Sequence, residues 1–336
     1  MVSLKDIAQI VGCDTSTVSR ALNDSKEVSD ETKMAIKKIA KELNYTPNYS
    51  ARALVGKGMN TIGVVVPEFS SNHFAQLIGY IEMILKQNNF FLFVGISHHQ
   101  LANEIECINN MLSRGVDGIL LAFPIYSKLQ EFLMKIREKS NIPIVTTQPQ
   151  ASLSEIDCVM VDDDYGYDLL MKHIANRGHK DLGFVGDRIS TNLRLGPCLR
   201  AAEKYGMKLD KKHIVIEKPM YEKGGYVAMS KLLEQPGPLP TAVIASYDDI
   251  AIGAAKAILD HNLRIPEDIS ICGYDNIKES AYLACPLTTI APPYFEMAQL
   301  STKMLLEQIR TKEQKPRQHI QLNPSLVIRD SIAKIK

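Results

Sequence analysis

Residues 15–23 read Thr15-Ser16-Thr17-Val18-Ser19-Arg20-Ala21-Leu22-Asn23. At helical spacing, this stretch has small polar residues on one side and an apolar stripe on the other. A helix of this composition suits the major groove of DNA, because bulky apolar side chains could not face the bases there. The pattern alone fits any small helical bundle, and taken by itself it favours that simpler interpretation.

Two more helices are predicted, one on each side of this stretch. The first begins at Ser3, which together with Asp6 can satisfy free helix amides, and it ends at Gly12. Asp14 is expected to cap the central helix, and the third helix begins near Ser29. The apolar stripes of the two outer helices comprise Leu4, Ile7, Ala8, Val11, Ile36, Ile39, Ala40 and Leu43. Three short helices with a tight turn between the first two predict a helix-turn-helix unit.

The remainder of the chain alternates short apolar runs with amphipathic stretches. The apolar runs are those of parallel strands buried on both faces, and they include 62–66, 91–94, 118–121, 142–145, 182–185, 242–245 and 269–272. The helical segments predicted between them include 73–87, 128–139, 165–177 and 248–260. This alternation predicts a doubly wound α/β body with two similar lobes and a crossover near 158–162. Ligands bind at the carboxyl ends of the strands in such sheets.

Two clusters of polar residues invite a metal-site interpretation. His98 and His99 are predicted at a strand end, where adjacent side chains point in opposite directions, so they are not expected to share a metal ion. Asp162-Asp163-Asp164 is expected to form a helix N-cap and a solvated turn before Tyr165. The sequence contains no GxSxG elbow, no P-loop and no zinc-ligand spacing, so neither an enzyme nor a cofactor nor a metal site is expected.

Composition and charge limit the class of protein. The 336 residues are 45% hydrophobic and 23% charged, as in folded soluble proteins, and the net charge of +1 gives no sign of a polyanion partner. Residues 1–58 carry nine Lys/Arg against seven Asp/Glu, a net of +2, which leaves −1 for the rest of the chain. The six cysteines form no CxxC pair, and no apolar signal core or membrane-length apolar run is found. A cytoplasmic protein with reduced thiols and no membrane partner is therefore expected.

Several motifs of the N-terminal segment recur together in one known group of proteins. They are Asp6-Ile7-Ala8, Gly12, Thr17-Val18-Ser19-Arg20-Ala21-Leu22-Asn23, Leu43-Asn44-Tyr45-Thr46-Pro47-Asn48 and Ala51-Arg52-Ala53-Leu54. This segment resembles the DNA-binding headpiece and hinge of the LacI/GalR family of bacterial repressors. The resemblance continues over nearly all of the chain.

The resemblance implies a DNA-binding role for the residues that match the family's motif. These are Thr15, Ser16, Thr17, Ser19, Arg20, Asn23, Tyr45, Asn48, Arg52 and Leu54. Thr15 and Ser16 would discriminate operators, and Arg20 suits a bidentate contact with guanine. The three polar residues 17, 19 and 23 would contact phosphates. Leu54 would wedge into a minor-groove base step, and the Gly56-Lys57-Gly58 linker favours this role over burial against the body.

Further matching segments lie in the body of the chain. They are Asn72-His73-Phe74, Arg177-Gly178-His179, 263–270, Gly273-Tyr274-Asp275-Asn276 and 286–290. These segments resemble the periplasmic-binding-protein-like effector domain of the same family. The resemblance implies effector contacts by Phe74, Gln148, Arg194, Tyr221, Tyr247 and Asp275.

Three of these effector residues also have a simpler interpretation. Asp275 follows a buried strand and could accept two sugar hydroxyls, but it could also cap a loop. Arg194 could be a surface charge, and Phe74 a core residue. Departures from the family's pattern at Pro197-Cys198, Met220, Tyr247 and Pro292 leave the specificity open. A sugar or sugar phosphate is the expected effector, and a purine is the alternative.

These inferences together predict a homodimeric repressor that binds a near-palindromic operator in double-stranded DNA. Residues 1–46 would form the helix-turn-helix domain, 47–58 the hinge helix and linker, and 59–336 the effector and dimerisation domain. The two subdomains of the body are expected at about 59–160 plus 291–322 and 161–290 plus 323–336. A sugar-binding protein for transport and a nucleotide-using α/β enzyme are the alternatives.

Overall fold

The computed structural model describes residues 2–45, 58–149, 153–311 and 316–335. The chain forms two compact units, Met1–Met59 and Asn60–Lys336. Asn48, Arg52 and Leu54, which the sequence assigns to DNA binding, lie outside the described residues.

The N-terminal unit contains three short helices around a small core. They are α1 (Leu4–Val11), α2 (Thr15–Leu22) and α3 (Asp30–Glu42). Ser3 and Asp6 form the predicted capping box, and Gly12 ends α1 with a left-handed φ of 75°. Asp14 occupies the predicted N-cap position of α2, but its side chain makes no capping hydrogen bond. Ile7, Val18, Ala21 and Ile36 are fully buried where the helices meet.

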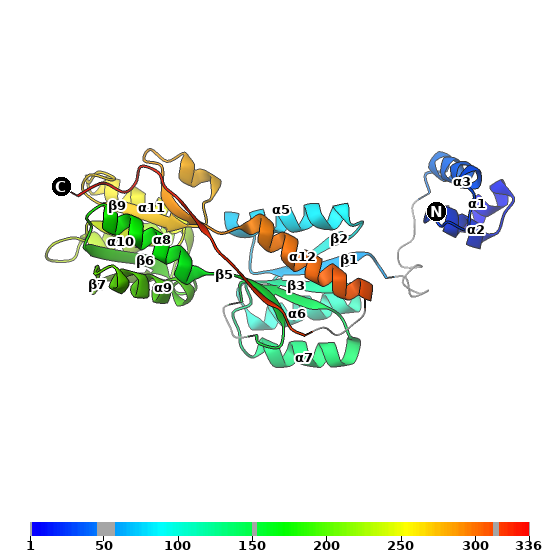
Figure 1. Ribbon diagram of the computed structural model, residues 1–336, viewed down its shortest axis with the longest axis horizontal. Helices are drawn as coiled ribbons and strands as arrows, with labels where there is room; N and C mark the ends of the chain where they lie inside the picture. The colour runs from blue at the N-terminus through cyan, green and yellow to red at the C-terminus, as the bar shows by residue number, and fades with distance from the viewer. Residues whose placement is uncertain (1, 46–57, 150–152, 312–315, 336) are drawn as a thin grey trace. The chain divides into compact units, whose positions relative to one another are not determined.

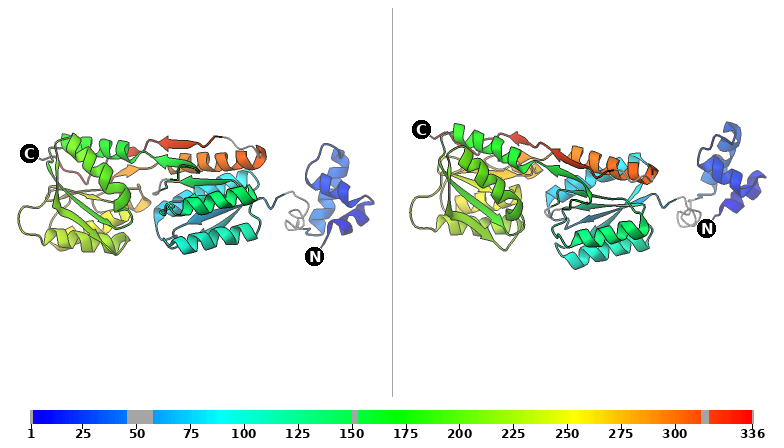
Figure 2. Two further views of the ribbon diagram at one scale, coloured as in Figure 1. Left: turned by 90° about the horizontal axis from the view of Figure 1, so that it is seen from below. Right: turned by 60° about the horizontal axis from the view of Figure 1, so that its bottom comes forward.

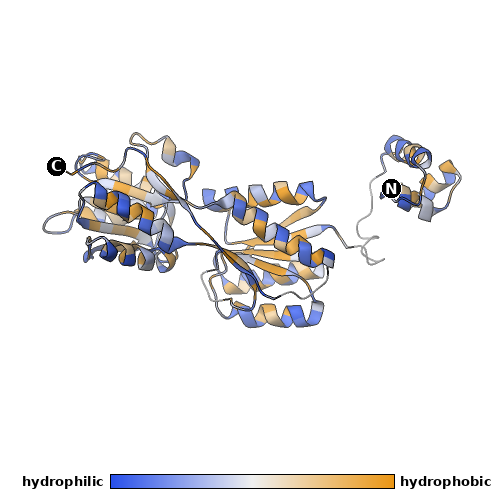
Figure 3. Cartoon of the chain, in the orientation of Figure 1, coloured by the Kyte–Doolittle hydropathy of each residue, from blue (hydrophilic) through white to orange (hydrophobic). Residues whose placement is uncertain are grey.

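The first lobe of the larger unit is built on a six-stranded parallel sheet. Its strands, in spatial order, are β11 (His319–Leu322), β5 (Asp157–Val161), β4 (Ile144–Thr147), β3 (Gly118–Ala122), β1 (Thr61–Val66) and β2 (Phe91–Ile96). One face is covered by α5 (Asn72–Gln87) and α12 (Tyr294–Thr311), and the other by α6 (Leu101–Ser113) and α7 (Leu129–Ser140), as Figure 1 shows. Figure 3 shows the apolar strands between these two layers of amphipathic helices.

The second lobe repeats this winding with a six-stranded sheet in which only the edge strand β12 is antiparallel to its neighbour. Its strands, in spatial order, are β12 (Ser325–Val327), β10 (Thr288–Ala291), β9 (Ser270–Tyr274), β8 (Ala242–Ala245), β6 (Asp181–Asp187) and β7 (Lys208–Glu217). Its helices are α8 (Asp163–Asn176), α9 (Thr191–Lys204), α10 (Tyr221–Leu233) and α11 (Asp248–Asp260), with a 3-10 turn, η1 (Lys278–Ala281). The doubly wound α/β fold predicted from the sequence is confirmed.

Three chain passages connect the two lobes. The chain crosses after β5, again between β10 and α12, and a third time between β11 and β12. Figure 2 shows these crossing segments running side by side along one side of the body. The first sheet therefore includes a strand from the C-terminal part of the chain, and α12 returns to cover it.

Some local expectations were wrong. Helix α8 begins at Asp163, two residues before the predicted start at Tyr165, because Asp162 accepts a hydrogen bond from the Tyr165 amide and serves as the N-cap. His98 and His99 lie in a turn with φ values of 51° and 54°, because β2 ends at Ile96.

Within the described ranges, no helix combines the length and apolarity needed to cross a membrane. In the same part of the chain, no three His, Cys, Asp or Glu side chains cluster as a metal ion would require.

Candidate DNA-binding surface and effector site

Helix α2 exposes the polar residues that the sequence assigns to base contacts. Thr15, Ser16, Arg20 and Asn23 are exposed, whereas Val18 and Ala21 are buried against the neighbouring helices. Thr17 and Ser19 are half-buried at the edges of this exposed face, and Tyr45 packs half-buried against the core of the unit. Burial of the apolar stripe therefore determines which side of α2 is free to contact a groove.

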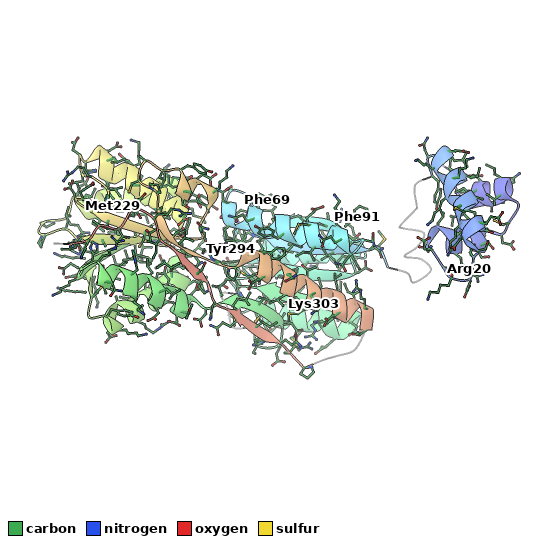
Figure 4. The ribbon with its side chains drawn as sticks, turned by 45° about the horizontal axis from the view of Figure 1, so that its top comes forward. Arg20, Phe69, Phe91, Met229, Tyr294 and Lys303 are labelled. Atoms are coloured by element: carbon green, nitrogen blue, oxygen red, sulfur yellow. The ribbon has the colours of Figure 1, made fainter. Side chains whose placement is uncertain are left out.

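Arg20 has a partner within its own unit. Its Nε lies 3.2 Å from Oε2 of Glu27, and the two side chains are 56% and 70% exposed. Figure 4 shows the Arg20 side chain extending away from the helices of its unit. A pair this exposed contributes about 0–1 kcal/mol, so a DNA base or phosphate can displace Glu27 at small cost.

The larger unit contains a cleft at the carboxyl ends of the strands of both lobes. About 570 Å³ of space lies between its walls, part of it open to solvent. The walls are formed by Pro67, Glu68, Ser71, His73, Phe74, His99, Phe123, Ile125, Asp187, Ile189, Ser190, Leu193, Arg194, Met220, Tyr221, Tyr247 and Asp275. Several of these residues follow β1 and β3 in one lobe and β6 and β8 in the other, the strand pairs at which each sheet reverses its winding. Ligands of doubly wound sheets bind at this switch point.

Five of the six predicted effector residues line the cleft: Phe74, Arg194, Tyr221, Tyr247 and Asp275. Gln148 is buried but is not among the residues of the walls. Its Oε1 accepts the Val161 amide at 2.6 Å, and its Nε2 donates to Asp163 Oδ2 at 3.2 Å. In this structure Gln148 therefore supports the first crossover between the lobes.

Arg194 is the arginine that lines the cleft. Its guanidinium donates to Asp163 Oδ1 at 2.5 Å and lies 4.0 Å from Asp275 Oδ1. Its Cζ stands 3.4 Å from the centre of the Tyr274 ring, whose hydroxyl also donates to Asp163 Oδ1. Burial alone lowers the pKa of Arg194, but the two carboxylates outweigh this effect and raise it above its usual value. Arg194 is therefore a permanently charged donor in a largely apolar cleft.

The expectation of a solvated turn was wrong for Asp163. Its side chain is only 11% exposed because it is the buried counter-ion of Arg194. Burial raises the pKa of Asp163, and the Arg194 guanidinium counteracts part of that rise. Asp163 therefore fixes the guanidinium that faces the ligand space.

A second polar group is organised around Asp187 at the end of β6. Oδ1 of Asp187 accepts the amides of Ile189 and Ser190, both at 2.8 Å. Oδ2 accepts the Tyr247 hydroxyl at 2.7 Å, and that hydroxyl accepts the Tyr221 amide at 2.9 Å. Burial, followed by the charge of Asp187, raises the pKa of Tyr247, so it remains a donor at physiological pH.

The sequence analysis did not assign several residues that line or support the cleft to the effector site. These are Glu68, His73, His99, Asp163, Asp187, Ser190, Tyr274 and Tyr294. The position of Glu68 after β1 and of Asp187 at the end of β6 was a usable signal, because strand ends form the ligand edge of such sheets. Tyr294 had no such signal, since it begins a helix far along the chain and reaches the site only because α12 returns to the first lobe.

A helical module with an exposed polar face, joined to a two-lobed body with a central cleft, defines a DNA-binding regulator with a receptor domain. Two family models match the chain: "Bacterial regulatory proteins, lacI family" over residues 3–48 and "Periplasmic binding protein-like domain" over residues 171–332. The chain is 30% identical to the HTH-type transcriptional repressor PurR of Shigella dysenteriae, covering 99% of this chain and 97% of that protein. It is 31% identical to the ribose operon repressor of Haemophilus influenzae over the whole of both chains.

The structure is also similar to that of a Lac repressor dimer bound to operator and the anti-inducer ONPF. The TM-score is 0.86 at 25% identity, with 99% of each chain covered. The chain belongs to the LacI family of bacterial regulatory proteins. It is a DNA-binding transcriptional regulator, and its relatives named above are repressors.

Proposed function

We propose that this protein is a homodimeric repressor whose operator affinity is controlled by a small carbohydrate, or its phosphate, bound in the cleft. The observation that carries the proposal is the juxtaposition of Arg194 and Asp275 in a cleft that also presents the aromatic rings of Phe74 and Tyr221. An ionised carboxylate accepts two hydroxyls, and a guanidinium donates to hydroxyl or phosphate oxygens. Aromatic faces pack against the apolar face of a sugar ring. A purine is the alternative ligand, since it too stacks on aromatic rings.

The DNA contacts proposed from the sequence fit the exposed face of α2. Thr15, Ser16 and Arg20 would read base edges, and the polar residues at its margins would contact phosphates. Residues 1–46 would form the reading domain and 47–58 the hinge, with Leu54 as its minor-groove wedge. Two such modules on a two-fold axis would read a near-palindromic operator, as befits a relative of a Lac repressor dimer seen on its operator. A bacterial operator implies that the protein acts in the cytoplasm.

Ligand control requires that the carbohydrate bind one arrangement of the lobes better than another. The walls of the cleft come from both lobes, so a ligand that contacts both stabilises one relative orientation. Coupling to DNA binding then follows if that orientation changes the contact between the hinges of a dimer. The ligand is proposed to be released unchanged, which sets this function apart from an enzyme's.

Replacing Arg20 by alanine is expected to weaken binding to the cognate operator by about 1–3 kcal/mol and to relax preference at one base pair. The reason is the loss of a bidentate contact to guanine. Glu27→Gln is the matched control, because it removes only the partner that holds Arg20 in the free protein. Fluorescence titration against single-base operator variants measures the affinity and the base preference of each variant protein. An equal loss of affinity on every DNA sequence would show that Arg20 contacts only phosphates.

The function is tested with a thermal-shift screen of sugars, sugar phosphates and purines on the full chain, repeated on Asp275→Ala. A stabilising compound should lose at least about tenfold in affinity in the variant, because a charged acceptor is worth about 1.5–3 kcal/mol. Operator binding by the variant reports that it is folded. A sugar that binds the variant as well as the original protein contradicts the assignment of Asp275. A purine as the only stabilising compound contradicts the sugar class, and chemical conversion of the ligand would favour an enzyme.

A further inference from the structure

Behind Asp275, a chain of hydrogen bonds leads from the second lobe to the first. The Tyr294 hydroxyl lies 2.7 Å from Asp275 Oδ1, and His73 Nδ1 lies 2.5 Å from the same hydroxyl. Asp275 follows β9, whereas His73 belongs to α5 of the first lobe. Tyr294 begins α12, and Figure 4 shows it at the end of that helix nearest the second lobe.

The donors in this chain follow from the chemistry of its end group. An ionised carboxylate can only accept, so Tyr294 donates its single hydrogen to Asp275. The hydroxyl oxygen of Tyr294 must then accept the contact from His73, which places a hydrogen on Nδ1. In a neutral imidazole with a hydrogen on Nδ1, the other nitrogen, Nε2, carries a lone pair and is an acceptor.

The Nε2 atom of His73 is left without a protein partner. His73 is only 6% exposed and lines the cleft, and Nε2 finds no hydrogen bond among the described residues. Its ring is held by edge-to-face contacts with Phe74, Phe123 and Tyr294, at centroid distances of 4.6, 4.8 and 4.8 Å. A buried acceptor with a fixed direction and no protein partner is unfavourable unless a ligand or a water molecule in the cleft supplies the donor.

We propose that His73 is a specificity-determining residue whose Nε2 accepts a hydrogen bond from a hydroxyl of the bound ligand. Tyr294 and Asp275 are positioning residues that hold His73 in the required tautomer. This inference rests on the proposed binding of a carbohydrate in the cleft. The bare Nε2 atom would favour ligands that place a hydroxyl donor beside it over ligands that place only an acceptor there. Asp275 then has two roles: its carboxylate accepts hydrogen bonds from the ligand, and it orients the Tyr294 hydroxyl that keeps the hydrogen of His73 on Nδ1.

The tautomer is measured first, in the full-length protein without ligand. Long-range proton–nitrogen NMR of ¹⁵N-histidine protein, with His73→Phe to assign the resonances, should show hydrogen on Nδ1 and a bare Nε2. Tyr294→Phe removes the hydroxyl that accepts from Nδ1 and should mix the two tautomers. A hydrogen on Nε2 of the wild-type protein, through either the other tautomer or a doubly protonated ring, overturns the inference.

Binding is measured next with D-ribose, D-glucose and their phosphates. The Nε2 resonance of His73 should move on binding, and His73→Phe should bind about tenfold more weakly, the loss of one hydrogen bond. Phe123→Leu is a packing comparison, because Phe123 contacts the rings of His73 and Phe74 and lines the cleft but offers no hydrogen-bond acceptor; the Nε2 resonance should still move on binding in this variant. An Nε2 resonance that does not move on binding in the wild-type protein shows that His73 only packs. If none of these sugars binds, the proposal of a carbohydrate effector is contradicted. The NMR measurement of the tautomer then tests separately whether His73 Nε2 is an acceptor.

Discussion

Arg194→Ala is expected to abolish binding of the effector, with an affinity at least about a hundredfold lower, and to destabilise the protein by about 3–5 kcal/mol. The substitution removes the only cation among the cleft-lining residues of the described chain other than its histidines. It also leaves Asp163 and Asp275 buried beside each other without a counter-ion, since each lies within 4.0 Å of the guanidinium. Chemical denaturation measures the stability, and calorimetry with the effector measures the affinity.

Arg200→Ala is the matched control for this prediction. Arg200 lies on the same helix as Arg194 and pairs with Asp164 on α8 at 2.7 Å, but its side chain is 60% exposed. An exposed pair of this kind contributes about 0–1 kcal/mol, so stability and effector binding should hardly change. A similar loss of stability in both variants would show that burial does not distinguish the two ion pairs.

The pH dependence of the Arg194→Ala variant has a definite sign. Burial already raises the pKa of Asp163 in the folded protein, and removing Arg194 removes the charge that counteracts this rise. A carboxyl with a raised folded pKa costs stability as pH increases, because the folded state must give up its proton. The stability deficit of the variant should therefore be largest near neutral pH and shrink as pH falls toward the usual aspartate pKa of about 4.

Gly253→Ala is expected to cost about 3 kcal/mol of stability. A Cβ built on Gly253 in α11 would lie 1.8 Å from the Glu222 carbonyl oxygen, so the backbones of α10 and α11 would have to separate. Gly225 faces the same contact from the other side, with a Cβ 1.9 Å from the Ile250 carbonyl oxygen. Backbone cannot move aside as the end of a flexible side chain can, so overpacking here displaces whole helices.

The control for Gly253→Ala is Gly79→Ala on α5. A Cβ at Gly79 meets no atom of the chain within 4 Å, so alanine should stabilise that helix by about 0.5–1 kcal/mol. Thermal and denaturant unfolding of both variants measures the difference. Unchanged stability of Gly253→Ala would mean that α10 and α11 are not in backbone contact.

The N-terminal unit could be predicted almost completely because its signals are local. The capping box at Ser3, the left-handed turn at Gly12 and the apolar stripe of α2 each depend on residues a few positions apart. Asp14 was the exception. A residue at the N-cap position accepts hydrogen bonds from the free helix amides only if its side chain adopts a suitable rotamer, and the sequence does not specify that rotamer.

The cleft was only partly predictable. Phe74, Arg194 and Asp275 were found through motifs, and these residues do line one site. Gln148 was assigned to effector binding on the same basis, but its hydrogen bonds hold the chain where it crosses from the first lobe to the second. Asp163 was expected to be solvated, because a run of aspartates at a helix start is usually exposed, but it is buried beside Arg194. Burial of a charge depends on what a distant segment places next to it, here Arg194 on α9.

By itself, the sequence determined which segments form helices and which form parallel strands. It also determined that α2 carries a polar face and that a ligand site lies at the strand ends. Periodicity and residue type carry this information because secondary structure is governed by local spacing. Only the tertiary structure decided which side chains meet. Tyr294 reaches His73 and Asp275 because the chain crosses between the lobes and α12 returns to the first one. Hydrogen bonds and ion pairs act over a few ångströms of space, and their partners here lie between 19 and 221 positions apart in the chain, so no local pattern could have paired them.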